Sequence, residues 1–118
     1  MSKRIESESR IQQSIVVFFR NNYQRKGIDK GLIFSVPNER TGGYQAMRPL
    51  LLTGLLSGVS DLIVVLEGRV IFVEVKNSIG KQSDKQKLFE TQVENLGFEY
   101  HVVRTLNEFI LILNLNTK

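Results

Sequence analysis

Residues 58–76 decide the fold, and they read Gly-Val-Ser-Asp-Leu-Ile-Val-Val-Leu-Glu-Gly-Arg-Val-Ile-Phe-Val-Glu-Val-Lys. Two apolar runs, Asp61–Leu66 and Arg69–Val75, are separated by Glu67 and Gly68. Two β-rich runs joined by a two-residue turn with glycine in second place are typical of a β-hairpin. This stretch therefore predicts two antiparallel strands at the centre of the protein.

The register of this hairpin predicts that three polar side chains meet at its open end. With Glu67 and Gly68 as the turn, Asp61 lies opposite Glu74. Directly opposed side chains share a sheet face and lie about 5 Å apart at Cβ. Lys76 follows two residues after Glu74 and so shares that face. We therefore expect Asp61, Glu74 and Lys76 to converge.

The convergence favours a metal site that hydrolyses phosphodiesters. Two opposed carboxylates repel each other unless a cation lies between them. Mg²⁺ prefers oxygen ligands, so Asp61, Glu74 and the Val75 carbonyl are candidate ligands. Lys76 can orient or help to deprotonate an attacking water. The alternative is that Asp61 caps a strand and that Glu74 and Lys76 form a solvated polar face, which the apolar character of both strands disfavours.

The rest of the chain predicts helices and two further strands around the hairpin. Apolar spacing, caps and breakers give the expected elements. They are a helix over 5–25, a strand over 32–36, a polar loop over 38–48, a short helix over 49–56, a polar loop over 77–82, a helix from the Ser83 cap to 96, a strand over 98–104 and a helix from the Thr105 cap to 113. Ser83 with Gln86, and Thr105 with Glu108, match the capping-box pattern. We expect an α/β domain with a small mixed central sheet flanked by helices.

Length and composition set the class of protein. A chain of 118 residues predicts one domain over 1–118. The absence of cysteine excludes disulfides, thiolate zinc sites and cysteine nucleophiles and suits a reducing cytosol. A net charge of +4 and a pI of 9.6 are compatible with a polyanionic partner. No apolar stretch is long enough to span a bilayer, and residues 1–20 show no signal-peptide pattern.

Several short motifs together resemble a known nuclease family. Asp61 followed by Glu74-Val75-Lys76 resembles the PD-(D/E)xK signature of restriction-endonuclease-like nucleases. The ordered set is similar to the virus-type replication-repair nucleases, the VRR-NUC family, over nearly the whole chain. Its pieces are Glu8-Ser-Arg-Ile-Gln12, Val36-Pro-Asn38, Gly58-Val-Ser-Asp61, Glu74-Val-Lys76 and Ser83-Asp-Lys-Gln86. One position departs from the pattern, because Ser60 stands where the signature has proline.

The resemblance implies a restriction-endonuclease-like core and a role for each matched residue. Asp61 and Glu74 would hold Mg²⁺ or Mn²⁺, and Lys76 would be the catalytic lysine. Glu8 would reach the site from the first helix, as a further carboxylate or through water. Gln86 would stand near the active site. The residues alone leave plainer readings open, since an acid such as Glu8 suits the first turn of a helix and Gln86 already suits a capping box.

The resemblance also implies a metal-dependent, structure-specific DNA endonuclease in a bacterial or phage-infected host cytosol. Small members of the family act on branched DNA, such as four-way (Holliday) junctions, as homodimers. Four cations near the expected site are candidates for binding phosphates: Arg40, Arg48, Lys81 and Lys85. The alternatives are a flap, nick or single-strand nuclease of the same fold, a non-catalytic DNA-binding module, and a protein-interaction domain. Ordinary solvated surface is the alternative for each cation.

Overall fold

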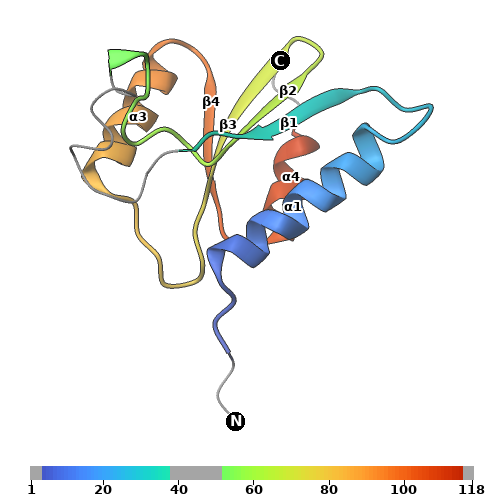
Figure 1. Ribbon diagram of the computed structural model, residues 1–118, viewed down its shortest axis with the longest axis horizontal. Helices are drawn as coiled ribbons and strands as arrows, with labels where there is room; N and C mark the ends of the chain where they lie inside the picture. The colour runs from blue at the N-terminus through green and yellow to red at the C-terminus, as the bar shows by residue number, and fades with distance from the viewer. Residues whose placement is uncertain (1–3, 38–51, 116–118) are drawn as a thin grey trace.

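The computed structural model describes residues 4–37 and 52–115, which form a four-stranded mixed sheet between helices (Figure 1). The strands are β1 (Gly31–Ser35), β2 (Leu62–Leu66), β3 (Arg69–Val75) and β4 (Glu99–Val103), in the spatial order β1-β2-β3-β4. β1, β2 and β3 pair in antiparallel fashion, and β4 lies parallel to β3. The predicted hairpin register is confirmed, since Leu66 pairs with Arg69 and Ile63 with Phe72.

Helices cover both faces of the sheet. α1 (Glu8–Tyr23) and α4 (Leu106–Leu113) lie together on one face, and α3 (Asp84–Asn95) covers the other (Figure 1). The expected fold class, an α/β domain with a small mixed sheet flanked by helices, is confirmed. None of the helices in the described ranges is long and apolar enough to cross a membrane.

The strict alternation of side chains along β3 divides the core in two. Ile71, Val73 and Val75 point toward α1 and α4, where they join the larger apolar cluster. Phe72 points the other way, toward a smaller cluster beneath α3. Glu74 lies between Val73 and Val75 and therefore faces α3. Glu74 thus lies on the face of the sheet that α3 covers.

Local hydrogen bonds explain where the element boundaries differ from those expected. α1 begins at Glu8 rather than at residue 5, because the Ser7 hydroxyl accepts the N–H of Arg10 and caps the helix. The expected second capping box is incomplete: Thr105 accepts the N–H of Glu108, but the Glu108 carboxylate accepts the N–H of Arg104 instead. β1 begins and ends one residue earlier than expected, β2 begins one residue later, and β4 is one residue shorter at each end.

The expected short helix over 49–56 is described only from residue 52 onward. There the helix ends at Leu52, and a turn at Thr53 and Gly54 follows. The expected polar loop over 38–48 lies outside the described residues.

A charged pair fastens β3, β4 and α4 together at the turn end of the hairpin. Arg69 donates to both Glu99 carboxylate oxygens, from Nε at 2.6 Å and from Nη2 at 2.8 Å. It also donates to the carbonyls of Ile112 (2.8 Å) and Leu113 (3.3 Å), which are C-terminal carbonyls of α4. These hydrogen bonds lower the pKa of Glu99 and satisfy helix-end acceptors that would otherwise lack donors.

Removal of this anchor is expected to destabilise the fold. Arg69→Ala should lower the free energy of unfolding by about 2–4 kcal/mol, because it leaves a partly buried carboxylate and two carbonyls without donors. Arg69→Lys should recover part of the loss, since an ammonium cannot reproduce the planar fork. Urea denaturation measures both. A loss below about 0.5 kcal/mol, no larger than that of the exposed Arg20→Ala control, would show that the anchor contributes nothing.

Candidate functional site

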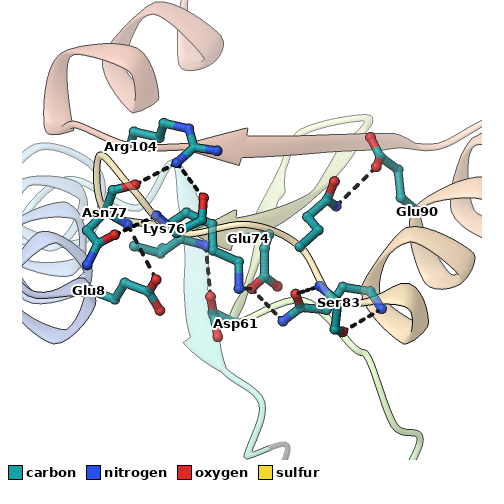
Figure 2. A network of polar contacts seen from close by, with 12 residues as sticks. Glu8, Asp61, Glu74, Lys76, Asn77, Ser83, Glu90 and Arg104 are labelled. Atoms are coloured by element: carbon teal, nitrogen blue, oxygen red, sulfur yellow. Dashed lines mark hydrogen bonds and ion pairs between the residues drawn. The ribbon is translucent and has the colours of Figure 1, made fainter.

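Asp61, Glu74 and Lys76 come together at the C-terminal end of β3, on the face that α3 covers (Figure 2). The Nζ atom of Lys76 lies 3.5 Å from Oε2 of Glu74. Asp61 precedes β2, and its Oδ2 accepts the N–H of Val75 at 2.8 Å. The convergence expected from the hairpin is therefore present.

Asp61 occupies the place where β2 would have continued. Because β2 begins at Leu62, the Val75 N–H has no ladder partner there and donates to the Asp61 carboxylate instead. The N–H and C=O of one strand residue point to the same neighbour. The Val75 carbonyl therefore leaves β3 on the side of Asp61, as a third oxygen ligand would require.

The segment before Asp61 is held tightly against α3. Gly58 has a φ of +86°, and a Cβ placed there would lie 2.4 Å from the carbonyl oxygen of Lys85. Ser60 is fully buried, and its hydroxyl donates to the carbonyl of Leu62 at 3.3 Å. Serine thus fits the position where the resembled signature has proline, because its side chain ties the turn to β2.

Glu74 is a buried acid with one free oxygen. Its residue is 1% exposed, and its Oε1 has no hydrogen-bond partner among the described residues. Burial, followed by the charge of Asp61, raises the pKa of Glu74 to about 8, against the opposing effect of Lys76. A buried carboxylate with an unsatisfied oxygen and a second carboxylate beside it is an arrangement that a cation would stabilise.

The raised pKa of Glu74 predicts how stability depends on pH in the absence of metal. The folded protein holds this proton up to about pH 8, whereas the unfolded chain releases it near the ordinary glutamate value of 4.5. The folded state therefore binds the extra proton between these pH values, and stability falls as pH rises through the range, by on the order of 5 kcal/mol in total. Denaturation in a metal chelator at several pH values measures this. Glu74→Gln should flatten the profile, and an unchanged slope in that variant would contradict the assignment.

Gln86 joins the first turn of α3 to Glu74. Its Oε1 accepts the N–H of Ser83 at 2.8 Å, which completes the capping box. Its Nε2 donates to Oε2 of Glu74 at 2.9 Å (Figure 2). The two readings of Gln86 are thus compatible, since one amide caps the helix and contacts the buried acid.

Glu8 contacts the loop that follows Lys76. Its Oε2 accepts the N–H of Asn77 at 3.4 Å and lies against Gly80 (Figure 2). Across residues 4–37 and 52–115, no group of three or more His, Cys, Asp or Glu side chains is arranged to hold a metal ion. Asp61 and Glu74 therefore lie at one site beside Val75, and Glu8 as a ligand, directly or through water, stays a prediction.

Two residues that the sequence analysis did not single out hold the loop after Lys76. Arg104 Nη1 donates to the carbonyls of Asn77 (2.6 Å) and Gly80 (2.8 Å). The Asn77 side chain accepts the N–H of Gly80 at 2.7 Å. Such a side-chain turn is a local signal that the sequence carried at Asn77. Arg104 gave no such signal, because its partners lie more than twenty residues earlier in the chain.

Two of the four predicted DNA-binding cations, Lys81 and Lys85, lie within the described structure. Arg40 and Arg48 lie outside the described residues. Lys81 is exposed on the loop before α3. Lys85 is exposed on α3, and its backbone lies against Gly58.

Comparisons with known proteins identify the fold. No protein-family model matches the chain, and no curated protein sequence matches it. Among solved structures, a "VRR_NUC domain protein" superposes with a TM-score of 0.72 and 16% identity, over 94% of this chain and 88% of that one. A "VRR_NUC domain" superposes with a TM-score of 0.60 and 22% identity, over 94% of this chain and 100% of that one. The fold resemblance expected from the motifs is confirmed: the chain has the restriction-endonuclease-like fold of VRR_NUC domains.

Proposed function

We propose that this protein belongs to the VRR-NUC family and is a divalent-metal-dependent endonuclease that hydrolyses DNA phosphodiester bonds. One observation carries the proposal. Glu74 lies buried beside Asp61 and Lys76, with a free carboxylate oxygen, at the end of β3 in a VRR_NUC-type fold. A merely structural acid in this place would have its oxygens paired.

The residues at the site fit a hard divalent cation. Asp61, Glu74 and the Val75 carbonyl offer the oxygen ligands that Mg²⁺ and Mn²⁺ accept, with water and a phosphate oxygen to complete the shell. Such an ion would supply charge neutralisation between the acids, polarisation of the phosphate and a lower pKa for bound water.

The side chains of the protein would orient the reaction. Lys76, held 3.5 Å from Glu74, would hold the attacking water and stabilise the negative charge of the transition state. The water oxygen forms a bond to phosphorus, one P–O ester bond breaks, and the departing oxygen takes up a proton. Gln86 would keep Oε2 of Glu74 in place through its 2.9 Å hydrogen bond, which leaves Oε1 for the ion.

The proposed substrate is branched DNA, such as a four-way junction, cut by a homodimer in the cytosol. The sequence offers no recognition helix or zinc module, so selection by DNA shape is favoured over selection by base sequence. Two sites related by a twofold axis suit paired cuts on opposing strands. This part of the proposal rests on the resemblance to the family.

A panel of labelled DNA structures tests the function. Four-way junctions, flaps, nicked duplexes, single strands and linear duplexes are incubated with and without Mg²⁺. Cleavage that needs the metal, prefers the junction and is lost in Asp61→Asn is expected. Metal-dependent cleavage of flaps or single strands instead would contradict the proposed substrate, but the protein would still be a metal-dependent nuclease. Binding without any cleavage would favour a non-catalytic DNA-binding module.

Light scattering tests the assembly. A dimer mass at micromolar protein concentration is expected. A monomer that still cleaves junctions fully would overturn the homodimer.

If calorimetric titration with Mn²⁺ shows no binding, the metal-dependent mechanism is wrong.

A further inference from the structure

A hollow of about 730 Å³ lies beside the site, at the free edge of β4. Residues of the loop before α3, of α3, of β4 and of α4 line it. They are Lys81, Gln82, Lys87, Val102, Arg104, Glu108, Leu111 and Ile112. In the described part of the chain, no further strand pairs with β4 on this side. The hollow is therefore a surface that the fold leaves open.

The hollow begins one strand away from Glu74, the proposed metal ligand. Val102 of β4 pairs with Glu74 of β3 in the parallel register. Adjacent strands lie about 4.8 Å apart. Val102 belongs to the cluster on the α3 face, which is also the face that carries Glu74. A strand of nucleic acid with one phosphate at Glu74 would therefore have its neighbouring backbone within reach of this hollow.

The charges that line the hollow favour a polyanion. The lining contains three cations, Lys81, Lys87 and Arg104, and one acid. That acid, Glu108, accepts the backbone N–H of Arg104 at 2.7 Å. Within the described residues neither lysine forms an ion pair, so both are available to a ligand.

Arg104 gives the hollow a fixed cation. Its Nη1 is held by the carbonyls of Asn77 and Gly80. Its Nε and Nη2 have no partner among the described residues. A guanidinium that is anchored through one nitrogen loses little further entropy when it binds a phosphate with the others. Flexible surface lysines alone would lack this feature.

We infer that this hollow binds the phosphodiester backbone of the nucleic-acid strand that runs through the proposed active site. The inference rests on the proposed function and adds to it a place and a direction. The strand crosses from Glu74 over the edge of β4 toward the start of α4. Val102, Leu111 and Ile112 would contact the sugars, and Lys81, Lys87 and Arg104 the phosphates. Lys85, whose backbone lies against Gly58, does not line this surface.

The salt dependence of DNA binding tests the inference without requiring cleavage. Binding of a short labelled duplex is measured by fluorescence anisotropy over a range of salt concentrations, with a metal chelator present. Lys81→Gln and Lys87→Gln should each weaken binding about fivefold at low salt and reduce the slope of log K against log salt by about 0.9. The double variant should lose about twice that slope.

Lys26→Gln is the matched control. Lys26 is exposed and lies three residues beyond the C-terminal end of α1, a 16-residue helix about 24 Å long that begins at Glu8. Its loss of charge should leave the slope unchanged. Arg104 is not substituted, because it also holds the loop over 77–80.

Each outcome decides the matter. If the wild type binds and cleaves DNA but both lysine variants keep its salt slope, the hollow is not a backbone site and the proposed function stands. If the variants keep the slope but weaken dimer formation, the hollow is a protein contact and the inference is wrong. If the wild type binds no DNA at any salt concentration, the inference and the proposed function both fail.

Discussion

Replacement of Lys76 by alanine is expected to reduce Mg²⁺-dependent DNA cleavage by about three orders of magnitude. The Lys76 side chain is 11% exposed and lies 3.5 Å from Glu74, so no nearby solvent ion can take its place with the same geometry. Its removal takes away the positive charge that would orient water and stabilise the transition state. Initial rates on the preferred DNA structure measure the loss.

The controls for Lys76→Ala separate chemistry from folding and binding. Lys76→Arg keeps the charge but places it differently, and it should recover little activity. Lys26→Ala, an exposed lysine beyond the end of α1, should cleave as the wild type does. Circular dichroism should show that the Lys76→Ala protein is folded, and fluorescence anisotropy should show that it still binds DNA. If this variant cleaves within about tenfold of the wild type, Lys76 is not the catalytic lysine.

The second large effect is expected at Gly58. Alanine there would place a Cβ 2.4 Å from the carbonyl oxygen of Lys85 and 2.6 Å from its carbonyl carbon, at a φ of +86°. Neither backbone atom can move without shifting the first turn of α3, which carries Gln86. We expect Gly58→Ala to lower the free energy of unfolding by roughly 3 kcal/mol or more and to reduce cleavage as Asp61 shifts.

Gly68 supplies a matched control for Gly58. It also has a positive φ, of +67°, but a Cβ there would meet nothing within 4 Å. Gly68→Ala therefore carries the backbone strain without the collision and should cost only about 1 kcal/mol. Urea denaturation of the two variants compares them directly. Equal losses would show that the contact between Gly58 and α3 is unimportant.

The hairpin and its site could be predicted because their information is local. A two-residue turn sets the register of two neighbouring strands, and the period of two along a strand then fixes which side chains share a face. These two local rules were enough to predict that Asp61, Glu74 and Lys76 converge. The capping box at Ser83 is local in the same way, because it spans four consecutive residues.

Contacts between distant segments could not be read from the sequence in the same way. Arg69 reaches Glu99 and the end of α4 across thirty or more residues. The second capping box was expected at Thr105, yet the Glu108 carboxylate bonds the N–H of Arg104. The expected box lies within residues 105–108, whereas the observed bond reaches back one residue further, to Arg104 at the end of β4.

By itself, the sequence determined the hairpin register, the meeting of Asp61, Glu74 and Lys76, and the order of helices and strands around them. Turn geometry, side-chain alternation and helix caps act over a few residues, so a pattern along the chain is enough. The tertiary structure alone decided that Glu74 is buried with one oxygen that has no partner among the described residues, that Glu8 accepts the N–H of Asn77, and that Arg104 borders an open hollow. Burial, pKa shifts and cavities depend on which distant elements pack together, because each is a property of the space between segments rather than of any one segment.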